Sequence, residues 1–327
     1  MRHDGSFPMQ SHLNKKMIPG RCRLEFWEEG AGVSNARLTP GQLFHESALW
    51  QRDIIDFGPW KPVDTDPAGY RWADRIWRSQ KAYGNRKVII CGPCGSAMDV
   101  AWELSRQGCL ETWDSVVAVS QQTGRGQRHR SWASPVGNLY AAWCWPGPEM
   151  LANRDWEGLL PLIAGYIAAD VLIVKGLRAC IKWPNDLLVN GRKIGGILLE
   201  QKAGRIMVGI GINLDSHPDD HLLRDEFAVP ATSLANEAIS ATPLSLWLDL
   251  TAAGEKKFNQ IVESMTPAEW TKIFNQRLAW IGKRVRIQSA DSDAFEAIVS
   301  GVAEDGGLKL QSGSMTNTLY SGSLVLV

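Results

Sequence analysis

Twelve residues near the middle of the chain combine a bare backbone with a high density of positive charge. Residues 121–132 read Gln-Gln-Thr-Gly-Arg-Gly-Gln-Arg-His-Arg-Ser-Trp. The two glycines let backbone N–H groups approach a ligand closely. Arg125, Arg128 and Arg130 supply permanent charge and paired donors that suit phosphate or carboxylate groups. This Gly/Arg loop is typical of a segment that holds an anion, and a solvated basic turn is the alternative.

A second segment, residues 181–186, places a lysine inside an apolar strand. A buried ammonium group is costly unless it meets an anion. Pro184 favours an extended or turn conformation for the residue before it, Trp183. A lysine that reaches the surface, or that pairs with Asp186, is the alternative to a ligand-binding Lys182. Together the two segments predict a site for an anionic ligand.

The elements that must position these segments alternate between short strands and helices. The predicted strands are 87–90, 115–119, 138–145, 180–183, 186–189, 193–200, 205–213, 284–288, 295–302, 308–310 and 323–327. The predicted helices begin after Ser96 and at 156, 244 and 267, and end at 108, 175, 258 and 278. Asn190-Gly191 is a strong hairpin signal. The first strand leads to the Ser96 helix, and the second delivers the Gly/Arg loop.

Composition limits the classes of function. The chain has 327 residues, 44% of them hydrophobic, and a formal net charge of zero. It therefore suits two or three domains and shows no excess of basic charge for nucleic acid, so no DNA partner is expected. Residues 1–20 lack the apolar run of a secretory signal, and the apolar stretch 159–174 is interrupted by Asp170. We expect a cytoplasmic protein with no membrane partner, in which 159–174 is a buried helix.

The first 84 residues carry no pattern that assigns a fold. Five of the chain's 15 tryptophans lie there, among prolines, glycines and charged residues, without sustained periodicity. No pair of short amphipathic helices stands out, so a helix-turn-helix is not expected. We divide the chain into a segment of unknown fold (1–84), a catalytic domain (85–279) and a small C-terminal β-barrel (280–327).

The motifs resemble those of the biotin protein ligases in order and spacing. That family's loop reads Q-Q/T-A-G-R-G-R-R-G-R-x-W, followed by S-P-x-G-x-L-Y, and this chain has related residues at 121–132 and 134–140. The family's K-W-P-N-D-L and K-x-x-G-I-L-x-E match 182–187 and 193–200. Its G-x-G-I-N matches 209–213. Several matches in the right order are far more specific than a single glycine motif.

The resemblance covers residues 86–327 and implies both a fold and a reaction. The fold would be α+β: a mixed sheet like that of class II synthetases, flanked by helices, with a small C-terminal β-barrel. The reaction would be ATP-dependent adenylation of biotin, followed by transfer to a lysine of a biotin carboxyl carrier protein domain. Charge stabilisation and positioning drive such chemistry more than an enzyme nucleophile does.

The resemblance also implies roles for single residues. Arg125 would hold the carboxylate of biotin and the phosphate of the adenylate, and Lys182 would offset the charge that develops on the reacting oxygens. Gln121 would bind the polar head of the ligand or fix the loop. Trp132 and Asn213 would border the nucleotide or order the loop. The full set expected to bind ligand or cofactor is Ser96, Ala97, Met98, Gln121, Gly124, Arg125, Gly126, Gln127, Arg128, Trp132, Lys182, Gly196 and Asn213. Mg²⁺ would arrive on the ATP phosphates, with Asp186 as its one candidate protein ligand.

The chain departs from the family at the wall expected to contact the biotin ring. The family's D-S-T-N is replaced by Gly95-Ser96-Ala97-Met98, which keeps the serine and puts Ala97 and Met98 where the family has polar Thr and Asn. A lipoate or octanoate ligase or transferase therefore stays open as an alternative. A non-catalytic sensor of biotin or its adenylate is a second alternative. Retention of Arg125 and Lys182 favours an enzyme.

Three further features lie outside the family pattern or are left open by it. Gln127 stands where the family has an arginine that helps to retain the adenylate, and His129 replaces a glycine. We expect Gln127 to let the intermediate escape. Cys91 and Cys94 have thioredoxin-like spacing before a helix, although the order of elements favours a structural coincidence over a redox pair. The strands after Cys180 could provide an edge for a homodimer.

Overall fold

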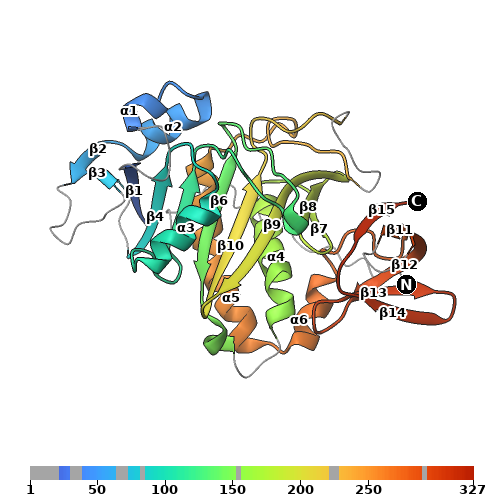
Figure 1. The fold of residues 1–327 in the computed structure, drawn as a ribbon. Helices are drawn as coiled ribbons and strands as arrows, with labels where there is room; N and C mark the ends of the chain where they lie inside the picture. Colours follow the sequence, from blue (N-terminus) through green and yellow to red (C-terminus); the bar gives the residue numbers. More distant parts are fainter. Residues whose placement is uncertain are drawn as a thin grey trace, which may run out of the picture.

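Ten strands form one mixed sheet through the larger part of the chain (Figure 1). The structure is a computed structural model that describes residues 22–29, 39–63, 73–81, 85–151, 156–220, 228–288 and 293–327. The strands are β1 (Cys22–Glu29), β2 (Trp60–Val63), β3 (Ala73–Ser79), β4 (Arg86–Cys91), β5 (Ser115–Ala118), β6 (Leu139–Trp145), β7 (Ala179–Lys182), β8 (Asp186–Val189), β9 (Arg192–Lys202) and β10 (Arg205–Ile212). They lie in the order β2-β3-β1-β4-β5-β6-β10-β9-β8-β7. β4 runs parallel to β1 and β5, and the other neighbouring pairs are antiparallel.

The sheet is covered on both faces, because successive side chains of its strands point to opposite sides. The helices are α1 (Pro40–Leu43), α2 (Ala48–Phe57), α3 (Ala97–Arg106), α4 (Leu160–Val174), α5 (Pro243–Ser264) and α6 (Pro267–Phe274). Val88 and Ile90 of β4 pack into the larger core with α4 and α5. Ile89 and Cys91 pack into a second core with α3. The predicted α+β fold with a flanked mixed sheet is confirmed.

The long apolar helix lies in the interior, as predicted. A short 3₁₀ turn, Glu157–Leu159, leads into α4. The stretch Glu157–Val174 is long and apolar enough to span a bilayer, but 61% of it is buried within the fold. α4 packs against α5, β7 and β9. Its apolar surface is therefore used by the core of this domain.

The N-terminal segment continues the main sheet. β1 pairs with β4 on one side and β3 on the other, and β2 forms the edge. α1 and α2, which the sequence did not reveal, begin at capping residues Thr39 and Ser47. The expected division at residue 84 runs between strands of one sheet, and as a boundary between folding units it stays a prediction. Residues 1–21 and Trp72 lie outside the described residues.

A buried carboxylate joins this segment to the catalytic core. Asp53 of α2 is fully buried and accepts hydrogen bonds from the Thr242 hydroxyl and from the Leu244 N–H, at 2.9 Å for the second. It thus caps the start of α5 beside that helix's own cap, Thr242. Burial raises the pKa of Asp53 from 3.8 to about 7, although the hydrogen bonds act in the opposite direction.

A short antiparallel sheet forms the C-terminal part. Its strands are β11 (Arg284–Gln288), β12 (Phe295–Val302), β13 (Leu308–Ser312), β14 (Met315–Leu319) and β15 (Ser323–Leu326), in the order β14-β13-β12-β11-β15. β14 was not predicted. Figure 1 shows this sheet beyond β7 and β8, at the end of the main sheet opposite β1–β3. This five-stranded sheet lies where the sequence predicted a small β-barrel, after residue 280.

The chain that enters this sheet covers the outer edge of β7. Ile181 N–H donates to the Arg277 carbonyl, and Ala279 N–H donates to the Ile181 carbonyl, both at 2.8 Å. The predicted helix 267–278 is therefore wrong in its last turn: α6 ends at Phe274, because residues 277–279 pair with β7 instead. A homodimer through this edge stays a prediction, and these residues already occupy part of it.

The Asp53 carboxyl group predicts a pH-dependent stability. An acid whose pKa is higher in the folded state stabilises the fold fully below its unfolded pKa, and this contribution is lost as the pH rises through the folded value. Since the pKa rises from 3.8 to about 7, the protonated carboxyl group contributes up to about 4 kcal/mol to the free energy of unfolding. Urea unfolding at pH 5 and pH 8 should show the wild type losing stability relative to Asp53→Asn at the higher pH. Parallel pH profiles for the two proteins would contradict this role.

Candidate active site

The Gly/Arg loop begins where the carboxyl ends of β4 and β5 meet. Gln122 N–H donates to the Cys94 carbonyl and Thr123 N–H to the Gly95 carbonyl, both at 2.9 Å. The loop is thus paired, strand-like, with the turn that leads into α3. The parallel arrangement of β4 and β5 brings the two turns to the same edge of the sheet.

Gln121 ties the loop to the start of α3. Its Oε1 accepts from the Ala97 N–H at 2.9 Å, and its Nε2 donates to Ser134 Oγ at 2.8 Å. Of the two predicted roles for Gln121, this geometry supports fixing the loop. Ser96 caps α3 by accepting from the Met98 N–H at 3.3 Å. The side chains of Ala97 and Met98 are buried.

Glycine is required at the base of the loop. A Cβ on Gly124 would lie 2.6 Å from both Ser134 Oγ and the Trp132 carbonyl oxygen. Trp132 N–H donates to the Gly124 carbonyl at 2.8 Å, which closes the base. Further out, Gly126 N–H donates to the Arg130 carbonyl at 2.7 Å. The loop is therefore a tight hairpin, with Arg128 at its tip in the left-handed region (φ 56°).

Arg125 is held by two carboxylates that sequence reasoning had not included in the site. Its Nη1 and Nη2 donate to Asp99 Oδ2 and Oδ1 at 2.7 and 2.6 Å, and Glu200 Oε1 lies 3.8 Å from Nη2. The hydrogen bonds to Asp99 raise the pKa of Arg125 further above its ordinary value. An acid three residues after the helix cap is a recognisable signal, and Asp99 is placed there. The guanidinium fork presents the bidentate geometry that a ligand carboxylate or phosphate would also use.

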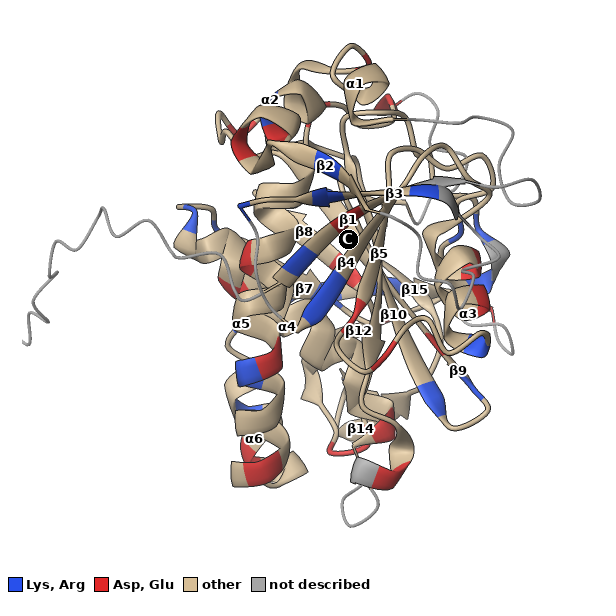
Figure 2. Ribbon diagram, turned by 90° about the vertical axis from the view of Figure 1, so that its left-hand side faces the viewer, with Lys and Arg blue, Asp and Glu red and all other residues tan. Residues whose placement is uncertain are grey.

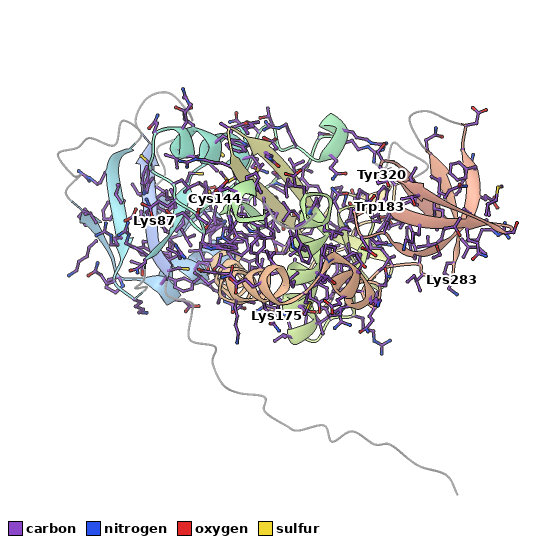
Figure 3. All side chains as sticks on the ribbon, turned by 90° about the horizontal axis from the view of Figure 1, so that it is seen from below. Lys87, Cys144, Lys175, Trp183, Lys283 and Tyr320 are labelled. Carbon is purple, nitrogen blue, oxygen red and sulfur yellow. The ribbon has the colours of Figure 1, made fainter. Side chains whose placement is uncertain are left out.

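The outer part of the loop meets the C-terminal sheet. Arg130 Nη2 donates to Ser323 Oγ at 3.1 Å. Gln127 and Arg128 line a cavity of about 210 Å³ at this junction. Its other walls come from the start of α4, Trp183-Pro184, and residues 305–306 and 320–322. Figure 3 shows Trp183 and Tyr320 close together there.

Lys182 is buried and belongs to a group of three charges. Asp186 Oδ2 lies 3.0 Å from Lys182 Nζ, and Asp186 Oδ1 lies 2.5 Å from Lys193 Nζ. Burial alone would raise the pKa of Asp186, but the ammonium groups of Lys193 and Lys182 outweigh it and lower the pKa to about 2. The pairing of Lys182 with Asp186, which the sequence left as an alternative, is present. The group nevertheless keeps a net positive charge for an anion.

The Trp132 indole packs against two glycines of the sheet. A Cβ on Gly211 would lie 2.8 Å from the indole, and one on Gly196 would lie 3.2 Å from it. These two glycines are register partners on β10 and β9. The indole Nε1 is buried and has no hydrogen-bond partner within the described part of the chain. Lys193 Nζ lies 5.2 Å from the centre of the ring.

Asn213 lies directly after β10. It is buried, and its Nδ2 donates to the Thr232 carbonyl at 3.0 Å. This contact orders the chain after β10, and the predicted role of Asn213 at the nucleotide or in the Gly/Arg loop stays a prediction. Asn138, to which sequence reasoning gave no role, accepts from the N–H groups of Leu214, Asp215 and Ser216 at 2.8–3.2 Å. Three successive N–H groups on one oxygen fix this turn.

The structure bears on two further predictions: a redox pair at Cys91 and Cys94, and a metal ligand at Asp186. Cys91 and Cys94 are buried and form no disulfide. The described residues contain no group of three or more His, Cys, Asp and Glu side chains that could hold a metal ion. Both oxygens of Asp186 are engaged by lysines. A role for Asp186 towards Mg²⁺ stays a prediction.

Comparison with known proteins identifies the family. Residues 92–216 match the biotin/lipoate A/B protein ligase family. The bifunctional ligase/repressor BirA of Salmonella typhimurium is 31% identical over 268 residues, which cover 78% of each chain. The biotin–[acetyl-CoA-carboxylase] ligase of Paracoccus denitrificans is 30% identical over 202 residues, which cover 60% of this chain and 83% of that one. This chain belongs to the biotin protein ligase family.

The fold of this ligase agrees with that assignment. The biotin protein ligase from Aquifex aeolicus, solved in complex with biotin and ATP, aligns with 73% of this chain and 98% of its own, with a TM-score of 0.61 and 22% identity. The motifs around Arg125 and Lys182 fall within the matched region. The roles of individual residues in this ligase stay predictions, and the geometry above indicates how each would act.

The group of three charges yields a prediction about stability. Asp186→Asn would leave two neighbouring ammonium groups, one of them buried, without their carboxylate. Breaking a buried ion pair by removing one partner costs about 3–5 kcal/mol. Urea unfolding at neutral pH should show a loss of this size. The control is Asp249→Asn, which breaks the more exposed pair with Lys175 and should cost no more than about 1 kcal/mol. Equal losses in the two variants would contradict the central place of Asp186.

Proposed function

We propose that this ligase adenylates biotin with ATP and then transfers the biotinyl group to a lysine of a carrier protein. In the first step the biotin carboxylate attacks the α-phosphate and pyrophosphate leaves. In the second step the lysine amine attacks the carbonyl carbon of the mixed anhydride, AMP leaves and the amine loses a proton. Mg²⁺ bound with ATP would neutralise the phosphates that leave.

One observation carries the proposal. The centre of the Trp132 ring, in the Gly/Arg loop, lies 5.2 Å from Lys193 Nζ. Lys193 and Lys182 both contact Asp186. The loop and the lysine strand, far apart in the sequence, therefore border one site. Arg125 would hold the carboxylate and the adenylate phosphate, while Lys182 would offset charge on the reacting oxygens. Neither step needs an enzyme nucleophile, since fixed cations and positioning lower the barrier.

The relatives support the choice of substrates. The Paracoccus relative is a biotin–[acetyl-CoA-carboxylase] ligase by name, and the Aquifex relative was solved with biotin and ATP. We infer that a biotin carboxyl carrier domain is the acceptor of this ligase as well. We place the reaction in the cytoplasm and expect no DNA partner. Basic and acidic residues are interspersed over the helices and strands in Figure 2, in keeping with equal numbers of each in the sequence.

The identity of the acid depends on the wall at the start of α3. Ala97 and Met98 present apolar side chains there, and Met98 packs close to Gly209, where a Cβ would lie 3.1 Å from its Sδ. Pyrophosphate release should be followed with biotin, lipoate and octanoate in turn, each with ATP and Mg²⁺. Release with lipoate or octanoate but not with biotin would move the assignment to that branch. No release with any acid would favour a sensor.

Lys182→Met tests the assigned catalytic lysine. Methionine keeps the apolar stem and removes the charge, while Asp186 keeps Lys193 as a partner. We expect the rate of pyrophosphate release to fall by at least about a hundredfold, the scale of losing one charge-stabilising group. Thermal unfolding should show that the protein stays folded. Retained turnover in a folded variant would refute the role of Lys182.

Gln127→Arg tests retention of the intermediate. Gln127 faces the cavity between the loop and the C-terminal sheet, where an arginine would add a charged donor for the adenylate phosphate. We expect the wild type to label its own lysines and those of a bystander protein, and Gln127→Arg to suppress that labelling. The control is Gln122→Arg, which adds the same charge at an exposed position of the loop. Suppression by both variants, or by neither, would contradict a specific role for position 127.

A further inference from the structure

We propose that Lys193 is a positioning residue that latches the Gly/Arg loop onto the sheet and steadies Lys182 at the same time. Lys193 begins the 193–200 motif, but neither the motif nor the family match gives this lysine a role. It contacts both the loop, at Trp132, and the lysine segment, at Asp186. Its Nζ lies 2.5 Å from Asp186 Oδ1 and 5.2 Å from the centre of the Trp132 ring.

The backbone of Lys193 is fixed on both sides. Its N–H donates to the Pro230 carbonyl at 2.7 Å, and its carbonyl accepts from the Thr232 N–H at 2.9 Å. The side chain starts from a rigid point of β9 and is 28% exposed, compared with 8% for Lys182. The ammonium group is thus accessible enough to meet the loop, and close enough to Asp186 to be held in one direction.

The indole of Trp132 packs against the smaller core around α3, but Lys193 is the one charged group placed over its ring among the described residues. Its indole rests on Gly196 and Gly211, and its Nε1 finds no hydrogen-bond partner among the described residues. A cation near the face of an indole is the strongest of the common cation–π pairs. Because Trp132 N–H also closes the base of the loop on the Gly124 carbonyl, holding the ring holds the whole hairpin.

The same ammonium group acts on Lys182 through Asp186. With Lys193 present, the two oxygens of Asp186 are shared between two cations, one on each side. Without it, Oδ1 would lose its partner and the carboxylate could rotate. Lys193 therefore couples the position of the loop to the position of the catalytic lysine.

Limited trypsin digestion of the full-length protein tests the latch without any substrate. Trypsin cuts after Arg125, Arg128 and Arg130 once the hairpin opens, and mass spectrometry gives the rate at these sites. We expect Lys193→Met to raise that rate about tenfold, in line with the strength of a partly desolvated cation–π pair. Lys193→Arg keeps the charge and stacks on an indole, so it should restore protection.

The chain offers a matched control in Lys257. That lysine also contacts both a carboxylate, Asp170, and an aromatic ring, Tyr166, whose centre lies 5.6 Å from Nζ. It lies on α5, and its partner ring and carboxylate are on α4. Lys257→Met should leave cleavage in the loop unchanged. An equal increase in both methionine variants would show general loosening and would overturn the proposal.

A double-mutant cycle separates the contact with Trp132 from other effects. If Lys193 acts through the ring, Lys193→Met should add almost nothing in a Trp132→Leu background, since the interaction is already lost. Additive effects would overturn the latch. Trp132→Leu also tests the contact from the loop side if Lys193→Met does not fold, because it leaves β9 unchanged. In that case unchanged cleavage in Trp132→Leu would overturn the proposal.

Retention of the adenylate gives a second readout, which rests on the proposed function. The half-life of enzyme-bound adenylate should fall in Lys193→Met and recover in Lys193→Arg, with no change in Lys257→Met. An unchanged half-life in a variant whose loop is cut faster would overturn the coupling to the reaction. If no adenylate forms even in the wild type, the proposed function fails while the digestion result still decides the latch.

Discussion

The carboxylate of Asp186 is the interaction on which the site depends. It is buried, so an isolated charge there would be costly, yet two ammonium groups from β7 and β9 keep it ionised and lower its pKa to about 2. Two lysines this close would otherwise repel each other. The shared carboxylate allows Lys182 to sit in an apolar strand and Lys193 to reach the loop. These three side chains, from the adjacent strands β7, β8 and β9, form one cluster with a net positive charge.

The parallel arrangement at the centre of the sheet explains why the loop and α3 meet. β4 and β5 run in the same direction, so the turn into α3 and the Gly/Arg loop leave the sheet at one edge. Hydrogen bonds from Gln121 to both sides then join them. An antiparallel pair would have sent these segments to opposite ends. Topology thus brings Asp99 within reach of Arg125, and side-chain chemistry completes the contact.

Much of this could be read from the sequence, because its signals are local. Apolar runs, the Ser96 cap and Asn190-Gly191 located most elements between 86 and 264. The N-terminal strands were missed because no local period marks them, and because β1 pairs with strands far along the chain, β3 and β4. The predicted helix 267–278 ran too far because pairing with β7 overrides helical propensity at residues 277 and 278. Asp99, Glu200 and Lys193 were missed because their roles depend on which strands become neighbours.

Arg125, Lys182 and Lys193 each have a carboxylate partner, and this shapes how an anion could bind. Arg125 is paired with Asp99, whereas Lys182 and Lys193 share Asp186. Asp99 is about half exposed, so water can solvate its carboxylate once Arg125 turns to a ligand. Asp186 is buried, so it has no such replacement and must keep at least one lysine. Arg125 would therefore be free to exchange Asp99 for a ligand, whereas at least one of Lys182 and Lys193 must stay with Asp186. This asymmetry places the mobile contact on the loop and the fixed charge on the sheet.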